Sequence, residues 1–588
     1  MASATDVITL ENFQTKMPRW EPNLSNHLYA LVDMGSNGIR FSISDLSPPR
    51  ARLLNCLYRE RAAISLFDAL SSSSAGGPML FPTETITQVS HTLARFKSIA
   101  DAYGVPQEHI SVLATEAMRR AENADAMLDA ILEASYLRVQ VLAPEVETLF
   151  GAMGARSSFA EVNGLFLDLG GGSVQMSYMN SATEGYEFAA SQTGKSLPFG
   201  AARLINILDN DDSGMRKTAK HDLESGLRGA FVKLQQEFPS LKALSDGANH
   251  EGIDVYLCGG GFRGYGSMLM HNDPIQPYPI PAIGSYTVSG KSFKQTDVMR
   301  KVNENYDAKI HGMSKRRRKQ FPAIATVVEA LIEVVPRIRT VTFCSGGNRE
   351  GALLMRLPSV IREARPLELL HQPGDSMNDE VIQSVINTMV SAVPNGLDLS
   401  NIPTVFNLGL GPLFVGKIWS HLGEPSEANA AYELHRTVTR DPSTPGLTHL
   451  ARAVLGLTAC ARWGSTLGPV DRQLYSNLRA LTFIDSTEAN YWTDYFGAVA
   501  SVLTKVCPAE PRTATHLQKA IRFTAEMVEG KKKSHIELTI SISADAAKGI
   551  DLHDIGAVFE GVGKHKKDPF TVARRVEPIV VEHKIHTH

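Results

Sequence analysis

The sequence lacks the features of a membrane-spanning or secreted protein. None of its apolar runs reaches the roughly 18 residues that a membrane-spanning helix needs. The N-terminal segment contains acidic residues and no hydrophobic stretch, unlike a secretory signal. Five cysteines are scattered singly without a CxxC pair, which argues against a disulfide framework and a zinc site. We therefore expect a cytoplasmic protein that does not bind a membrane.

The sequence also lacks an excess of charge of either sign. Its formal net charge is -3 and 43% of its residues are apolar, as in ordinary globular proteins. Because proteins that bind nucleic acid are usually basic, no direct nucleic-acid contact is expected. A chain of 588 residues is too long for one hydrophobic core, so roughly three or four domains are expected.

What the chain has in abundance is glycine placed directly after apolar strands. The stretch Gly164 to Ser177 reads GLFLDLGGGSVQMS, an apolar run that ends in Asp168 and a glycine turn. Backbone N–H groups of such a turn can close on an anion, and the carboxylate suits a divalent metal that also binds phosphate. A β-hairpin with a glycine bulge would give the same pattern.

A second copy of this arrangement favours the phosphate-binding interpretation. Residues 28–32 form an apolar run that leads into Asp33, a glycine-containing turn and a second strand over residues 41–43. Two such hairpins about 135 residues apart predict two related lobes that each offer a loop to one shared anion. Further glycine turns follow predicted strands at residues 259–261 and 346–347, the place where open α/β sheets bind ligands.

Hydrophobic periodicity divides the chain into regions of different character. Strands and helices alternate up to about residue 360, helical patterns dominate after Pro366, and strand patterns return at residues 536–542 and 576–581. One of the helical patterns covers about residues 511–529. We expect the following domains: a loosely held tail (1–27), a first lobe (28–163), a second lobe (164–360), a helical module (361–507) and a small α+β domain (508–588).

Several segments together resemble the exopolyphosphatase/guanosine pentaphosphate phosphatase family, within the superfamily of sugar kinases, heat-shock-70 proteins and actin. In order along the chain they are DMGSNGIRFSI (33–43), ATEAMRRAENAD (114–125), EVETLFGAMGA (145–155), LDLGGGSVQMS (167–177), SLPFGAARL (196–204), LCGGGFRG (257–264) and NREGALL (348–354). The resemblance implies an α/β fold: a two-lobed, actin-like core of the duplicated ribonuclease H type, with a helical C-terminal module and a small α+β end. Within the family the chain looks most like the branch of fungal retrograde regulation proteins.

The resemblance also assigns phosphate-binding residues by their position in these motifs. Asp33, Gly35, Ser36 and Asn37 match a first phosphate loop, followed by Arg40 on the next strand. A second phosphate loop is matched by Asp168, Gly170, Gly171, Gly172 and Ser173, with Asp168 as the ligand of a magnesium ion. Gly259, Gly260 and Gly261 match a turn on the nucleotide side.

Three residues bear on whether the protein hydrolyses what it binds. Arg119 matches an arginine that contacts the phosphate chain, although a surface arginine at a helix start is the ordinary alternative. Glu147 lies where the family keeps a glutamate that activates water, and an exposed helix glutamate is its alternative. Gln175 stands where bacterial enzymes carry a second catalytic glutamate. Because an amide cannot accept a proton from water, Gln175 can orient a water or a phosphate but cannot act as a base.

The basic run at residues 315–319 allows three interpretations: a nuclear signal, a contact with polyphosphate, or a solvated helix start. Part of the run coincides with an arginine-containing segment of the family before Pro322, and this resemblance disfavours the nuclear signal.

The resemblance implies a regulatory protein of mitochondria-to-nucleus retrograde signalling that binds a phosphate chain or nucleotide and acts through a partner protein. The expected ligands are ATP, guanosine pentaphosphate or polyphosphate, and a homodimer is left open. The alternative is an active phosphohydrolase that releases terminal phosphate from polyphosphate or guanosine pentaphosphate. A sugar-kinase-like phosphotransferase has no acceptor-binding motif to support it.

Overall fold

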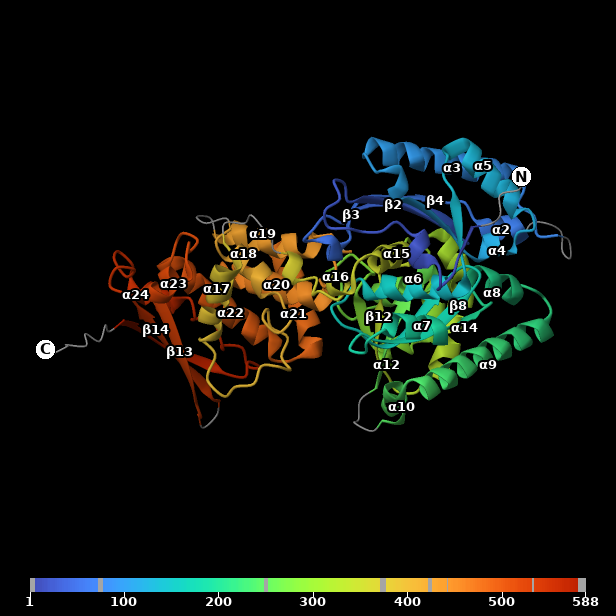
Figure 1. The fold of residues 1–588 in the computed structure, drawn as a ribbon. Coiled ribbons are helices and arrows are strands. Elements are labelled where there is room, and N and C mark those ends of the chain that lie inside the picture. The colour runs from blue at the N-terminus through green and yellow to red at the C-terminus, as the bar shows by residue number, and fades with distance from the viewer. Residues whose placement is uncertain are drawn as a thin grey trace. The chain divides into compact units, whose positions relative to one another are not determined.

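The computed structural model describes residues 6–71, 78–247, 252–370, 377–420, 426–441, 443–530 and 533–579. The chain forms two compact units. The core unit comprises Met1–Asp273, Pro281–Pro366 and Ser443–Gly446, and the C-terminal unit comprises Pro274–Ile280, Leu367–Pro442 and Leu447–His588. Figure 1 shows the elements of both units in chain order by colour.

The first lobe of the core unit is built on a six-stranded sheet in the order β1-β6-β5-β2-β3-β4. Strands β2, β3 and β4 form an antiparallel meander, and β5, β6 and β1 continue the sheet in parallel with β2. Its strands are β1 (Asp6–Ile8), β2 (Leu28–Gly35), β3 (Gly38–Asp45), β4 (Asn55–Ala62), β5 (Ile110–Ala114) and β6 (Val139–Leu142).

The second lobe repeats five strands of this topology in the order β11-β12-β10-β7-β8-β9, and differs at the edge strand β11, which is antiparallel to β12. Again three strands form an antiparallel meander, β7-β8-β9, and two parallel strands, β10 and β12, follow on the other side of the first one. The strands are β7 (Asn163–Leu169), β8 (Val174–Asn180), β9 (Lys195–Leu197), β10 (Ile253–Cys258), β11 (Tyr286–Ser289) and β12 (Ile338–Phe343). The predicted actin-like, duplicated α/β core is therefore confirmed.

Helices fill the connections between these strands. In the first lobe they are α1 (Phe13–Lys16), η1 (Ala51–Leu53), α2 (Leu66–Ser71), α3 (Thr83–Ala102), η2 (Gln107–His109), α4 (Glu116–Arg120), α5 (Ala124–Ser135) and α6 (Pro144–Arg156). In the second lobe they are α7 (Tyr186–Thr193), α8 (Ala201–Leu208), α9 (Ser213–Glu237), α10 (Pro239–Asp246), α11 (Gly259–His271), α12 (Gly290–Phe293), α13 (Thr296–Asn305), α14 (Lys315–Val334), α15 (Asn348–Arg356) and α16 (Ser359–Arg362).

The side-chain alternation of β2 gives the first sheet two apolar faces. Ala30, Val32 and Met34 pack in one cluster with side chains of α3 and α5, which lie over that face in Figure 1. Tyr29 and Leu31 belong to a second cluster, which also contains residues of α6, α15 and the second sheet. Helices α6 and α15 thus form part of the core that joins the two lobes.

Helices α6 and α15 approach so closely that their backbones touch. A Cβ added at Gly351 would lie 1.7 Å from the carbonyl oxygen of Phe150, and one at Gly154 would lie 2.1 Å from that of Gly347. Only glycine leaves room for this contact. The distance between the two helices is therefore set by main-chain atoms.

The prediction of a loosely held tail over residues 1–27 is wrong for residues 6–27. Strand β1 pairs in parallel with β6, and Phe13 and Trp20 are only 3% and 6% exposed. The Trp20 indole donates a hydrogen bond to the carbonyl of Leu46. A strand of three residues is too short for periodicity to reveal, and the contacts that hold it are distant in sequence. Residues 1–5 lie outside the described residues.

The C-terminal unit is helical and ends in a small sheet. Its helices are η3 (Glu368–Leu370), α17 (Asp379–Val390), α18 (Gly411–Ile418), α19 (Ser426–Thr439), α20 (His449–Arg462), α21 (Pro469–Asp485), α22 (Ala489–Val506), α23 (Ala514–Ala520) and α24 (Leu552–Ala557). The three-stranded sheet has the order β13-β14-β15, with β13 (Ile521–Val528), β14 (His535–Ile542) and β15 (Thr571–Pro578).

The helix predicted over residues 511–529 is wrong in its second half, where β13 forms. Ile521, Phe523 and Ala525 are buried and the residues between them are exposed, which is the alternation of a strand with one face on a core. The strands predicted at residues 536–542 and 576–581 form, and they pair in parallel as far as Pro578. Residues 580 and 581 lie outside the described part of the chain.

The observed boundary between the units falls after Pro366 rather than at the predicted residue 360. That the two lobes are separate domains stays a prediction, and so does the division of the C-terminal unit into a helical and an α+β domain.

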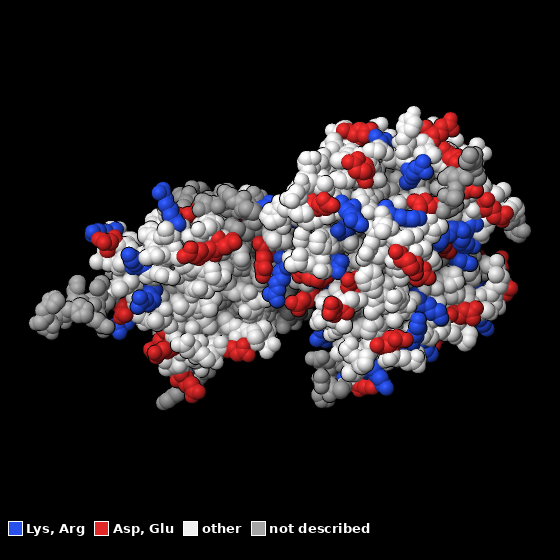
Figure 2. Space-filling model, viewed as in Figure 1, with Lys and Arg blue, Asp and Glu red and all other residues white. Residues whose placement is uncertain are grey.

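Among the described residues, none of the helices is long and apolar enough to cross a membrane. On the face drawn in Figure 2, basic and acidic side chains of the described residues are interspersed, in line with the small net charge.

Candidate functional site

The two predicted phosphate loops occupy equivalent places in the two lobes. Asp33 of β2 lies directly opposite Arg40 of β3 in the first hairpin. Asp168 of β7 lies opposite Gln175 of β8 in the second, at the same spacing along the chain. The duplication therefore gives each lobe one carboxylate near the end of its central strand, buried at Asp33 and half-buried at Asp168. The residue across the ladder is an arginine in one lobe and an amide in the other.

Both hairpins open into one cleft of about 690 Å³ within the core unit. The predicted site residues that line it are Asp33, Gly35, Ser36, Asn37, Arg40, Glu147, Asp168, Gly170, Gly171, Ser173, Gln175, Gly259 and Gly260. They come from both lobes and from α6, at the carboxyl ends of the central strands. Such an edge is where α/β sheets place their ligands.

Three predicted site residues do not line the cleft. Gly172 packs against Glu116, whose carboxylate would lie 2.0 Å from an added Cβ, and Gly261 packs against the side chain of Leu169. Arg119 donates to the Oε2 atom of Glu147 at 2.8 Å and to the carbonyl of Leu142. Arg119 therefore holds Glu147 in place, and the structure does not place it in the cleft as a phosphate contact.

The second loop is held by the helix that follows it. The N–H groups of Gly200 and Ala201 donate to the carbonyls of Gly172 and Gly170, each at 3.0 Å, and that of Ala202 donates to Gly171. In a trans peptide, the C=O of one residue and the N–H of the next residue point in opposite directions. The N–H group that follows each of these three carbonyls therefore faces away from α8. An anion that enters the cleft would meet donors of this kind.

Burial raises the pKa of each of the three carboxyl groups in the cleft. The pKa of Glu147 rises to about 7 because burial outweighs the attraction of Arg119, and the nearby Asp33 and Asp168 add to the rise. The pKa values of Asp33 and Asp168 are also raised by burial, against the attraction of Arg40, which acts on both. The cleft thus brings together three carboxyl groups whose ionisation is disfavoured. Such groups are typical of sites for catalysis or metal binding.

The carboxylates fit a magnesium ion that also binds phosphate. The Oδ1 atom of Asp33 is buried and has no hydrogen-bond partner among the described residues. Mg²⁺ typically binds one or two carboxylates and completes its coordination with water and substrate phosphates, so Asp33 and Asp168 suffice as protein ligands. Groups of three or more His, Cys, Asp or Glu that could hold a metal are absent from the described residues.

Arginines surround the outer part of the cleft. Arg40 and Arg263 line it. Burial lowers the pKa of Arg317 to about 10, and the positive charges of Arg263, Arg40 and Arg61 lower it further. Burial also lowers the pKa of Arg61, with Arg40 and Arg316 contributing. Guanidinium groups that repel one another in this way favour a bound anion.

The basic run at residues 315–319 contributes to this arginine cluster. It forms the first turns of α14, where Arg316 donates to Asn37 Oδ1 at 2.6 Å and to Ser65 Oγ at 2.8 Å. Arg61 donates to the carbonyl of Asn37 at 2.9 Å. The solvated-helix interpretation is therefore wrong for Arg316 and Arg317, which are half-buried. Their position favours contact with a phosphate chain, and the nuclear-signal interpretation stays untested.

Some lining residues were not predicted individually. They are Gly38, Thr115, Arg263, Gly346, Gly347 and Asn348. Thr115 begins the ATEAMRR motif, Arg263 lies in LCGGGFRG and Asn348 begins NREGALL. Each motif was recognised, so the signal for these positions was present although the side chain was not assigned.

Comparison with known proteins gives two family matches that together span most of the chain. Residues 47–360 match the Ppx/GppA phosphatase family and residues 365–578 match the RTG2 C-terminal domain. Retrograde regulation protein 2 of Saccharomyces cerevisiae is 31% identical over 500 residues, covering 82% of each chain. Exopolyphosphatase 1 of Mycobacterium leprae is 28% identical over 335 residues, covering 56% of this chain and 89% of that protein.

Solved structures of similar proteins cover just over half of the chain. The crystal structure of an exopolyphosphatase from Cytophaga hutchinsonii is 21% identical and covers 55% of this chain and 96% of its own, with a TM-score of 0.42. The Ppx/GppA enzyme of Aquifex aeolicus is 20% identical and covers 55% of this chain and 98% of its own, also with a TM-score of 0.42.

Proposed function

Because this chain belongs to the Ppx/GppA phosphatase family, we propose that its core unit binds a phosphate chain or nucleotide in the cleft between the two hairpins. We further propose that the protein is a cytoplasmic regulator of mitochondria-to-nucleus retrograde signalling that acts through a partner protein. The regulatory part rests on similarity to retrograde regulation protein 2.

The arginine cluster is the observation that carries the binding proposal. Besides burial, the charges of Arg40 and Arg316 lower the pKa of Arg61, and those of Arg263, Arg40 and Arg61 lower the pKa of Arg317. The carboxyl groups of Asp33 and Asp168 line the same cleft as Arg40 and Arg263. A ligand with several negative charges in a row, such as polyphosphate or the phosphate tail of ATP or guanosine pentaphosphate, would relieve this repulsion along its length.

Each part of the cleft has a role in this proposal. The N–H groups of Gly171 and Ser173 donate to phosphate oxygens, and Arg40 and Arg263 pair with their charges. Asp33 and Asp168 would hold a magnesium ion, which when bound neutralises phosphate charge and bridges phosphate oxygens to the protein. Thr115 and Asn348 offer further polar contacts at the wall of the cleft.

Gln175 favours binding over turnover. It is 5% exposed and lies across the β-ladder from Asp168. A glutamate at this position would add a further negative charge beside three carboxyl groups and could accept a proton, whereas the amide does neither. The amide therefore makes the cleft a better receptor for a polyanion and a poorer hydrolase.

The second candidate function is hydrolysis of the terminal phosphate, and Glu147 is the observation that favours it. Its pKa of about 7 is suited to a general base near neutral pH. Its side chain is oriented by the ion pair with Arg119 and lines the cleft. In this mechanism Glu147 takes a proton from a water as that water attacks the terminal phosphorus atom. The bond from that phosphorus to the bridging oxygen breaks, which releases orthophosphate, and the bridging oxygen leaves with the shortened phosphate chain.

One experiment separates the two candidates. Tripolyphosphate, ATP and guanosine pentaphosphate are each titrated into the full chain with magnesium by calorimetry, and phosphate release is followed in parallel. Binding without release supports the regulator, and release that disappears in Glu147→Ala supports the enzyme.

The variant Asp168→Ala tests the cleft itself, with Asp101→Ala as its control on the exposed surface of α3. We expect the first variant to weaken magnesium-dependent binding and the second to leave it unchanged. Absence of binding to all three ligands, or equal binding by wild type and Asp168→Ala, would contradict the proposed function.

A further inference from the structure

The small sheet of the C-terminal unit, drawn in red in Figure 1, has two edge strands of different character. One edge is β15, where Arg574 and Arg575 are adjacent and Pro578 ends the strand. Repeated charge and proline are common means by which proteins keep an edge strand from pairing with another chain. The other edge is β13, which has no proline and pairs with β14 over eight residues without a bulge. Strand β13 is therefore the edge that is suited to pairing.

The backbone of β13 carries hydrogen-bonding groups on its outer side. The N–H of Ser543 donates to the carbonyl of Ala520 at 3.0 Å, one step before the pair of Ile521 and Ile542. Because bonded and non-bonded pairs alternate in an antiparallel ladder, every second residue points its N–H and C=O away from β14. These residues are Ile521, Phe523, Ala525 and Met527. Among the described residues, no backbone group bonds to their outer side, so β13 can accept a further strand.

The exposed face of β13 carries one charge of each sign. Arg522 and Glu526 are both exposed, and neither forms an ion pair with another described residue. They are about 13 Å apart along the strand and do not pair with each other. Across the ladder Glu526 faces Glu537, and like charges in opposite positions destabilise a sheet. A cation beside Glu526 and an anion beside Arg522 would therefore stabilise β13.

We propose that β13 pairs with β13 of a second copy of this chain, which joins the two sheets into one. A two-fold axis perpendicular to the sheet makes the two strands antiparallel. With the axis at Thr524, Arg522 of each copy lies opposite Glu526 of the other, so the interface holds this ion pair twice. The dimer goes beyond the proposed binding of phosphate, since it uses a different unit of the chain.

The hydrogen-bond pattern agrees with the same register. Pairing about Thr524 brings the outward N–H and C=O groups of the two strands together. It also places Arg522 and Glu526 in non-hydrogen-bonded positions, where opposite side chains are closest. Pairing about Phe523 or Ala525 would match the backbone groups as well, but it would set both charges opposite uncharged residues. The charges therefore select one register.

The test is the mass of the full chain in sedimentation equilibrium at low salt, where exposed ion pairs are least screened. We expect a reversible dimer with twice the 64.0 kDa of one chain. Arg522→Glu and Glu526→Arg each turn two attractions into two repulsions, so each should raise the dissociation constant about tenfold or more. The double variant Arg522→Glu/Glu526→Arg restores opposite charges across the interface and should restore the dimer.

Arg575→Glu is the matched control, because Arg575 is exposed on the other edge strand, and it should leave the dimer unchanged. A chain that stays monomeric up to about 100 μM, where a complex of micromolar Kd forms, would overturn the proposal. So would an unchanged dissociation constant in either single variant, or a double variant that remains monomeric. Loss of the dimer in Arg575→Glu would place the contact on the other edge and would also overturn it.

Discussion

Replacing Glu147 by glutamine is expected to stabilise the core unit at neutral and alkaline pH. The Glu147 side chain is only 14% exposed, and burial raises its pKa from an ordinary 4.5 to about 7. At about 1.4 kcal/mol per pH unit, the difference between these two values amounts to about 3 kcal/mol. This is the cost of ionising Glu147 in the folded protein.

The direction of the effect follows from proton binding. Between pH 4.5 and about 7 the folded carboxyl keeps a proton that the unfolded chain has lost, so stability falls as the pH rises through this range. Above about pH 7 both states are ionised and the loss is complete. The glutamine variant has no such loss and can still accept the hydrogen bond from Arg119, so its advantage grows with pH.

Hydrogen exchange measures this difference within the core unit. Protection of peptides from β2 and β7 in wild type and Glu147→Gln is compared at each pH, so that intrinsic exchange rates cancel. The difference should grow toward about 3 kcal/mol between about pH 5 and about pH 8. Glu145→Gln is the control, because Glu145 is exposed and lies two residues earlier on α6. A difference in protection that stays constant over this pH range would refute the reasoning.

Three further predictions concern packing, charge and catalysis. Gly351→Ala should destabilise the core unit by about 3 kcal/mol or more in thermal denaturation, because the added Cβ would lie 1.7 Å from a backbone carbonyl oxygen of α6. Gly347→Ala is the control and should have little effect, because the Cβ added there meets open space. Arg316→Met should weaken tripolyphosphate binding about three- to tenfold in calorimetry and make it less sensitive to salt, with Arg228→Met as an unaffected control. Gln175→Glu should increase phosphate release with magnesium, and no gain would show that this amide is not what limits hydrolysis.

The parts of the site made by backbone could be predicted from the sequence. An apolar strand, an aspartate and a glycine turn are adjacent in the chain, so Asp33 and Asp168 with their loops are found by local pattern. The repeated spacing of the two hairpins also predicted the duplicated fold. These features need no knowledge of distant contacts.

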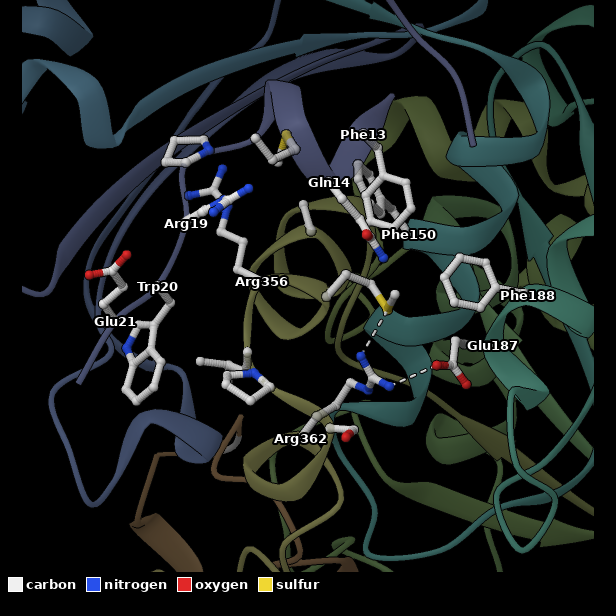
Figure 3. Close-up of a pocket in the computed structure, with 17 residues that line it drawn as sticks. Phe13, Gln14, Arg19, Trp20, Glu21, Phe150, Glu187, Phe188, Arg356 and Arg362 are labelled. Carbon is white, nitrogen blue, oxygen red and sulfur yellow. Dashed lines mark hydrogen bonds and ion pairs between the residues drawn. The ribbon is translucent and has the colours of Figure 1, made fainter. Parts of the chain in front are cut away.

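The features of the site that join residues far apart in the sequence could not be predicted in this way. Arg316 reaches the first phosphate loop from a helix 279 residues further along the chain, and a basic run at a helix start is ordinarily solvated. Arg119 was assigned to phosphate from its motif, whereas the fold turns its guanidinium onto Glu147. Strand β1 depends on pairing with β6, which no local pattern in the first 27 residues indicates. The ring of Phe13 in the same segment packs edge-on against that of Phe150 on α6 (Figure 3).

The glycine contact between α6 and α15 has a mechanical consequence. Helix α6 leads from β6 of the first lobe to β7 of the second, and its backbone is locked against α15 at Gly351 and Gly154. If the lobes rotate relative to one another, the rotation axis runs through the helix pair. The hairpin loops lie further from this axis and therefore move most. Glu147 and Asn348, one on each helix, keep their separation while the loops around them open and close.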